Sequence, residues 1–170
     1  PFAHFSSHGL KLKERDIYRL EAPDIGEMFH GALQWMTEQI IERGTSWGAL
    51  SREQCIQLAR TAVEVMAPKL QNEILLSSNR FHYLKRKLEQ IVARASITLS
   101  GQAKNSQFSP IGLELGFGRR GALPPLTFEL QNGTKMELAG RIDRIDQAKT
   151  DNGTYLRIID YKSSSKDLNF

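Results

Sequence analysis

Three charged side chains fall within two neighbouring apolar segments near the end of the sequence. Asp143 lies in "GRIDRID", residues 140–146, and Asp160 and Lys162 lie in "IIDYKSSS", residues 158–165. Strand interiors disfavour Asp, so acids at these positions need an explanation. Two close carboxylates repel each other unless a cation lies between them, and carboxylate oxygens suit Mg²⁺ or Mn²⁺. A lysine beside them could position a water or stabilise charge that develops on a phosphate.

The pairing of these two segments decides how the charged groups meet. Asn152-Gly153 lies between them and is a strong hairpin signal. A tight turn there sets Asp143 opposite Lys162, whereas a turn longer by two residues sets it opposite Asp160. In either register the two acids are direct or diagonal neighbours, about 5 to 8 Å apart at Cβ. A second interpretation stays open, namely an exposed ion-pair cluster of Asp160 with Lys162 or Arg141.

Asp146 is a further acid in the same segment. It lies three positions after Asp143, and successive strand residues point to opposite faces. We therefore expect Asp146 to lie on the other face of the sheet and to face solvent.

Composition limits the class of protein. The chain has 170 residues with 40% hydrophobic content, which suffices for one globular domain with a core. The net charge of +4 permits nucleic-acid binding without proving it. Cys55 is the single cysteine, so an internal disulfide framework is impossible. The sequence has neither an apolar run that could span a membrane nor a signal peptide, and it reads as an excised piece of a longer protein.

The first half of the chain has helical periodicity. We expect a first helix capped at Asp24 and ending near Gly44, and a second that starts at the Ser51 cap and runs to about Pro68. A third helix is expected over residues 80–95.

The second half has strand character. Residues 108–118 alternate with period two, which is typical of a strand. The segments "LTFEL" and "KMELAGRIDRIDQA" flank Asn132-Gly133, a second hairpin signal. We therefore predict an α+β fold in which N-terminal helices precede a mainly antiparallel sheet built from hairpins.

Several of these segments together resemble the RecB-like branch of the PD-(D/E)XK nuclease superfamily. "GRID" followed by "DYK" is similar to the second and third motifs of that superfamily, and Gly26 with His30 resembles the histidine motif of the branch. The N-terminal "PFAHFSSHGLKLKERD" is similar to the AddB/RexB family of bacterial helicase–nuclease subunits. The resemblance implies a single partial domain of the restriction-endonuclease-like fold over residues 1–170. Its helical part would cover about residues 1–105 and its sheet part about residues 106–170, and the final helix and strand of the core would be missing.

The resemblance also implies roles for particular residues. Asp143, Asp160, His30 and the backbone carbonyl of Tyr161 would hold Mg²⁺ or Mn²⁺, and Lys162 would orient the attacking water and stabilise the transition state. Glu114, in the preceding strand, is a further candidate ligand; otherwise it is a surface acid of an edge strand.

The function that the resemblance implies is metal-dependent exonuclease hydrolysis of one DNA strand. These 170 residues alone are expected to be weakly active or inactive, because the missing helix and cluster would support the site. It would belong to a bacterial cytoplasmic helicase–nuclease that processes double-strand ends for recombinational repair, with an AddA/RexA-type subunit as partner and no membrane association. The alternative is a non-catalytic module that binds DNA ends. Relatives carry a 4Fe-4S cluster on four cysteines, and Cys55 matches none of them, so the cluster is expected in the parent protein only.

Basic residues suggest where DNA could bind. The third expected helix is rich in cations, and a glycine-flanked loop carries two more. Either set could be an ordinary solvated surface or could track phosphates. The candidate contacts are Arg80, Lys85, Arg86, Lys87, Arg119 and Arg120.

Overall fold

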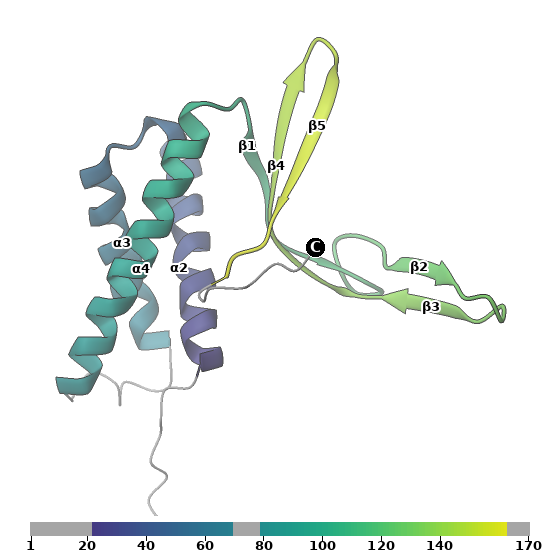
Figure 1. Ribbon diagram of the computed structural model, residues 1–170, viewed down its shortest axis with the longest axis horizontal. Coiled ribbons are helices and arrows are strands. Elements are labelled where there is room, and N and C mark those ends of the chain that lie inside the picture. Colours follow the sequence, from purple (N-terminus) through teal and green to yellow (C-terminus); the bar gives the residue numbers. More distant parts are fainter. Residues whose placement is uncertain (1–21, 70–78, 163–170) are drawn as a thin grey trace, which may run out of the picture.

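Helices form the first layer of the structure. The computed structural model describes residues 22–69 and 79–162. Its three long helices are α2 (Ala22–Glu42), α3 (Arg52–Met66) and α4 (Asn79–Lys104), with short 3₁₀ turns η2 (Trp47–Ala49) and η3 (Ala67–Lys69). The three helices pack against one another, and the strands lie to one side of them (Figure 1). The N-terminal segment that resembles AddB/RexB lies outside the described residues.

The three helices enclose the hydrophobic core. Leu33 and Met36 of α2, Val63 of α3 and Val92 of α4 are fully buried in one cluster. Pro68 follows α3 in η3, which confirms that this helix ends there. Cys55 is also buried, and burial raises the pKa of its thiol above the ordinary range, so it stays protonated at neutral pH.

The start of α3 follows directly from its sequence. The Ser51 hydroxyl accepts a hydrogen bond from the Gln54 N–H at 3.2 Å, and the Gln54 side chain accepts one from the Ser51 N–H at 2.8 Å. This reciprocal pair is a capping box, and the predicted cap is confirmed.

We expect Ser51→Ala to lower the free energy of unfolding by about 1 kcal/mol, because it leaves the Gln54 N–H without its partner. Urea unfolding would measure this loss. Ser46→Ala is the matched control, since Ser46 precedes η2 without a side-chain capping bond. Equal losses for the two variants would show that the capping box contributes nothing.

Two predicted helix boundaries were wrong. The first helix begins at Ala22, so Asp24 lies inside its first turn instead of capping it. The third helix continues to Lys104, nine residues past the predicted end at Ala95. Tertiary contacts account for this extension: the Ser100 hydroxyl donates to the Leu50 carbonyl at 3.1 Å, which anchors the last turns of α4 beside α3.

The strands form two separate antiparallel sheets. The larger has the order β1-β4-β5, made of β1 (Ser109–Phe117), β4 (Gly140–Thr150) and β5 (Gly153–Ile159). The smaller pairs β2 (Leu126–Glu129) with β3 (Lys135–Leu138). The β2–β3 and β4–β5 hairpins extend away from the helices in different directions (Figure 1).

The predicted long strand from Lys135 is divided at Ala139. Before this residue β3 pairs with β2, and after it β4 pairs with β1 through the partners Phe117 and Gly140. A Cβ atom on Gly140 would lie 2.8 Å from the Phe117 ring, so any larger residue at this position would force the ring to move.

Candidate metal centre

The register of the β4–β5 hairpin distinguishes the two predicted arrangements. Arg144 pairs with Ile159, so the same register continued by one residue sets Asp143 level with Asp160. The turn is nevertheless tight, because Thr150 pairs with Gly153 across two intervening residues. The prediction of a hairpin between these strands is therefore confirmed. Its two-residue turn lies at residues 151–152, one position before Asn152-Gly153, and it is not lengthened.

Glu114 completes a row of three acids across the sheet. Its neighbours Leu113 and Leu115 pair with Arg144 and Ile142, which sets Glu114 level with Asp143. The backbone of Glu114 has φ +50°, the one positive φ of a non-glycine residue in the described chain. Such a conformation is costly for a residue with a Cβ and is found mostly where function or packing requires it.

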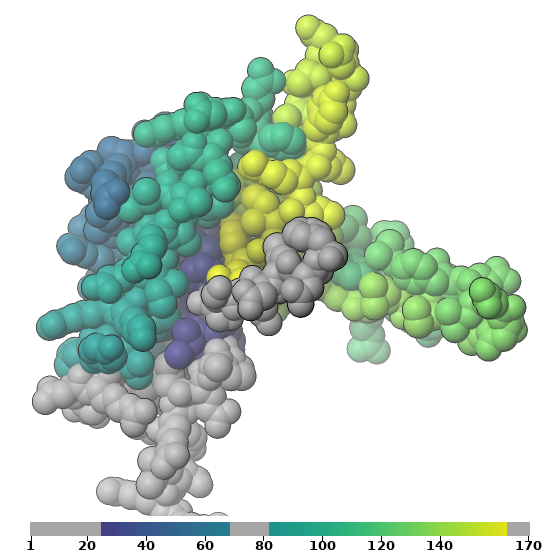
Figure 2. Space-filling view, viewed as in Figure 1, coloured from purple at the N-terminus to yellow at the C-terminus, as the bar shows by residue number. Residues whose placement is uncertain are grey.

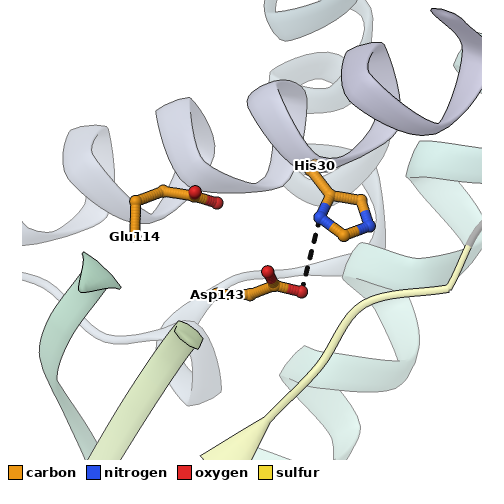
Figure 3. A group of neighbouring side chains, drawn as sticks. All are labelled: His30, Glu114 and Asp143. Carbon is orange, nitrogen blue, oxygen red and sulfur yellow. Dashed lines mark ion pairs between the residues drawn. The ribbon is translucent and has the colours of Figure 1, made fainter. Parts of the chain in front are cut away.

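The side chains of His30, Glu114 and Asp143 converge from three different elements. One ligand atom of each lies within 4.8 Å of the others. His30 projects from α2 toward the two carboxylates of β1 and β4, and its Nδ1 lies 3.3 Å from Asp143 Oδ2 (Figure 3). The side chains are between 11% and 29% exposed, so a small ion could reach them from solvent.

Neighbouring groups hold these three side chains in place. The Tyr161 N–H donates to Asp143 Oδ2 at 2.7 Å, and the Tyr161 ring packs edge-on against His30 with centroids 6.0 Å apart. Arg141 Nε lies 2.9 Å from Glu114 Oε2 and offsets part of the carboxylate repulsion. The contact seen for Tyr161 is thus from its N–H, whereas the sequence suggested a role for its carbonyl.

The structure does not bring the Asp160 and Lys162 side chains into this group. Lys162 Nζ lies 2.7 Å from Asp160 Oδ2, and both side chains are more than half exposed. Their hydrogen bond raises the pKa of Lys162, so its ammonium stays charged at neutral pH. The exposed ion pair foreseen as the alternative therefore exists beside the three converging ligands.

A hollow of about 500 Å³ opens next to the three side chains. It is bordered by α2, β1 and β4, and its lining residues are Gly26, Glu27, His30, Gly31, Gln34, Glu114 and Arg141. Gly26 and His30, four positions apart in the helix, therefore line the same hollow, as the motif spacing suggested.

The prediction that Asp146 faces solvent was wrong. Asp146 does lie on the face opposite Asp143, but that face is packed against the helical layer and the carboxylate is fully buried. Asp146 binds Arg144 Nε at 2.5 Å and Arg157 Nη2 at 2.7 Å. Strand parity was enough to separate the two acids but not to predict which face would be covered.

Arg144 and Arg157 were missed by the sequence reasoning. Arg144 lies 5.7 Å from the centroid of the buried Trp47 ring, and Arg157 lies 4.7 Å from that of Phe108. The sequence did contain a signal for an internal ion pair. In "RIDRID" an arginine lies two residues before Asp146, so both side chains share one face of the strand.

The predicted DNA contacts are scattered. Lys85 is paired with Glu64 at 3.3 Å and Glu89 at 3.8 Å, and Arg119 is paired with Glu137 at 2.6 Å. Arg86, Lys87 and Arg120 are exposed, and the side chain of Arg80 lies outside the described residues.

Known proteins resemble this chain over nearly its whole length. A profile of the PD-(D/E)XK nuclease superfamily matches residues 1–169, so the chain belongs to that superfamily. It is 58% identical over 168 residues to the AddB subunit of the ATP-dependent helicase/deoxyribonuclease of Bacillus subtilis (strain 168), and this match covers 99% of the chain. The subunits of the same name from Bacillus pumilus and Geobacillus thermodenitrificans are 57% and 54% identical, over 98% and 99% of the chain. The chain spans about 14% of the length of each of these relatives. No helix within the described residues is long and apolar enough to cross a membrane.

The positive φ of Glu114 leads to a test of the site. Glu114→Gly relieves the backbone strain and Glu114→Gln keeps it, while both remove the carboxylate. We expect the glycine variant to be more stable than the glutamine variant by about 1 kcal/mol in urea unfolding. Both should bind Mn²⁺ more weakly than the parent chain. A glutamine variant as stable as the glycine variant would show that the conformation costs nothing.

Proposed function

We propose that this chain is the metal-dependent DNA-hydrolysing module of a helicase–nuclease. The observation that carries the proposal is the convergence of His30, Glu114 and Asp143 from α2, β1 and β4, with ligand atoms within 4.8 Å of one another. The two carboxylates are ligands that suit Mg²⁺ or Mn²⁺, and the imidazole adds one nitrogen donor. Because the chain belongs to a nuclease superfamily, the reaction that we propose for this site is hydrolysis of a DNA phosphodiester.

The residues present fit such an ion. His30, Glu114 and Asp143 would hold it, and Asp160, level with Asp143 in the same row, is exposed and would add a carboxylate by turning away from Lys162. A bound divalent cation supplies Lewis-acid polarisation of a phosphoryl oxygen and lowers the pKa of a bound water. The Tyr161 N–H would keep Asp143 oriented during the reaction.

Lys162 has an electrostatic role in this proposal. Its ammonium is charged at neutral pH, so it cannot act as a general base but can donate to a non-bridging phosphate oxygen as negative charge develops. Lys162 directly follows Tyr161, whose N–H binds Asp143, so Lys162 lies at the edge of the metal centre.

The wider assignment rests on the relatives. Their name, which describes a subunit of an ATP-dependent helicase/deoxyribonuclease, supports DNA as substrate and a helicase–nuclease complex as the setting. We therefore propose cleavage of one strand at double-strand ends during recombinational repair in the bacterial cytoplasm, with an AddA/RexA-type partner. A 4Fe-4S cluster would belong to the parent protein and not to these residues.

Replacement of Lys162 tests the proposed reaction. We expect Lys162→Met to lower the rate of Mg²⁺-dependent cleavage of single-stranded DNA by about 100- to 1,000-fold, with Mn²⁺ affinity nearly unchanged. Lys149→Met, at an exposed position near the end of β4, is the charge-matched control and should keep the parent rate. If the longer protein that contains the unmutated chain shows no metal-dependent cleavage, a non-catalytic DNA-binding module is favoured instead.

A further inference from the structure

Four arginines surround one groove between α3 and α4. The groove has a volume of about 510 Å³, and its walls carry Arg52, Arg60, Arg86 and Arg94. All four side chains are exposed, and none forms an ion pair with a carboxylate in the described part of the chain. Glu89 also lines the groove, but it is engaged by Lys85 at 3.8 Å. The groove is therefore strongly cationic.

The packing of the helices arranges these arginines in two facing pairs. α3 and α4 run antiparallel, since Cys55 contacts Ser96 near one end and Glu64 contacts Lys85 near the other. Arg52 therefore lies within about one turn of Arg94, and Arg60 within about one turn of Arg86.

The spacing of the pairs suits a polymer of phosphates. Arginines on the same helix are eight residues apart, which corresponds to about 12 Å along the axis. A stacked DNA strand places a phosphate roughly every 3.4 Å, so the two pairs span several phosphates. The groove floor is apolar, with Ile56, Ala93 and Ile97, and offers surface to sugars and bases.

A second hollow lies beside the groove and is bordered by Lys162. This hollow, of about 310 Å³, is lined by Phe29, Ile91, Arg94, Ala95, Thr98 and Lys162. Arg94 borders both spaces, while Phe29 packs edge-on against His30 with centroids 6.1 Å apart. In the space-filling view the teal surface of α4 meets the yellow C-terminal end of the described chain (Figure 2).

We propose that the arginine groove binds the phosphate backbone of a single DNA strand and leads that strand past Arg94 and Lys162 to the metal centre. The delivery of the strand to the metal centre rests on the proposed function, whereas the binding of DNA in the groove does not. Unpaired guanidinium groups favour phosphate oxygens because each can donate two parallel hydrogen bonds.

Binding without metal tests the groove separately from catalysis. Fluorescence anisotropy with a labelled oligothymidine in EDTA compares the full 170-residue chain with the variant Arg52→Gln/Arg60→Gln. We expect the Kd of the variant to rise about tenfold or more at 0.1 M salt, and the slope of log Kd against log salt to fall by about 1.4. Arg52→Lys/Arg60→Lys should keep most of the slope, and melting curves would show that the fold is intact.

The matched control removes two exposed cations elsewhere. Arg43→Gln/Lys149→Gln should change the Kd less than twofold, because neither residue lines the groove. Equal effects of the two double variants would overturn the proposal. A groove variant that binds DNA as tightly as the unmutated chain but no longer co-elutes with a partner subunit would also overturn the proposal. In that case the groove would bind an acidic protein surface.

Photocrosslinking gives a second readout that does not depend on the isolated chain. In the complete helicase–nuclease assembly, an oligonucleotide with 4-thiothymidine should crosslink to peptides of α3 and α4, and a lack of crosslinks there would contradict the groove. Mg²⁺-dependent cleavage by an assembly that gives no crosslinks to α3 or α4 would overturn the groove alone. Groove binding without cleavage would overturn the proposed function alone.

Discussion

Asp143→Asn is expected to lower the rate of Mg²⁺-dependent DNA cleavage by about a thousandfold. Asp143 is the central ligand of the row, level with both Glu114 and Asp160, and its carboxylate lies 3.3 Å from His30 Nδ1. Removing its charge weakens the hold on a cation whose Lewis acidity contributes several kcal/mol, and each 1.4 kcal/mol or so corresponds to a factor of ten in rate.

The asparagine variant should remain folded, because its amide oxygen can still accept the hydrogen bond from the Tyr161 N–H. Gel assays of single-stranded DNA cleavage with Mg²⁺ would measure the rate. Asp151→Asn, at an exposed position in the β4–β5 turn, is the matched control and should cleave at the parent rate. An Asp143→Asn protein that cleaves within a few-fold of the parent would mean that Asp143 holds no catalytic ion.

The largest expected effect on stability comes from the other face of the same strand. Asp146→Ala should lower the free energy of unfolding by about 3 to 5 kcal/mol, because it leaves Arg144 buried without its carboxylate partner. The Arg144 side chain is only 2% exposed, so water cannot replace the lost charge partner. Urea unfolding followed by the fluorescence of Trp47, which lies against Arg144, would report the loss.

Two further variants show whether the buried charge is the cause. Glu129→Ala removes an exposed acid and should change the unfolding free energy by less than about 0.5 kcal/mol. Arg144→Met/Asp146→Leu replaces the buried pair with apolar groups and should lose less stability than Asp146→Ala. If Asp146→Ala and Glu129→Ala unfold at the same urea concentration, the ion pair has no structural role.

Local sequence signals predicted local structure well. The helix cap at Ser51 and the hairpin at Asn132-Gly133 depend on residues close in sequence, and both are present. The end of α4 was predicted too early because the residues after Ala95 include Ile97, Thr98 and Gly101, which are weak helix formers. Packing of the last turns against η2 and Leu50 overrides that intrinsic preference.

The candidate site was only partly predictable. The motifs singled out His30, Asp143, Asp160 and Lys162, with Glu114 as a further candidate. The fold brings the side chains of His30, Glu114 and Asp143 together, but it leaves those of Asp160 and Lys162 in an exposed ion pair beside them. The positive φ of Glu114 left no sequence signal, since glutamate gives no indication of a left-handed backbone. Burial of Asp146 could not be predicted either, because strand parity separates two faces without showing which one the helices cover.

In our proposal, His30, Glu114 and Asp143 together hold one divalent cation. Pulsed electron paramagnetic resonance of the chain with Mn²⁺ tests it directly, since ¹⁴N modulation of the electron spin echo detects an imidazole ligand. We predict one bound Mn²⁺ per chain with ¹⁴N modulation that disappears in His30→Ala, and much weaker binding in Asp143→Asn. Bound Mn²⁺ without nitrogen modulation, or equal binding by the parent and Asp143→Asn proteins, would contradict the claim.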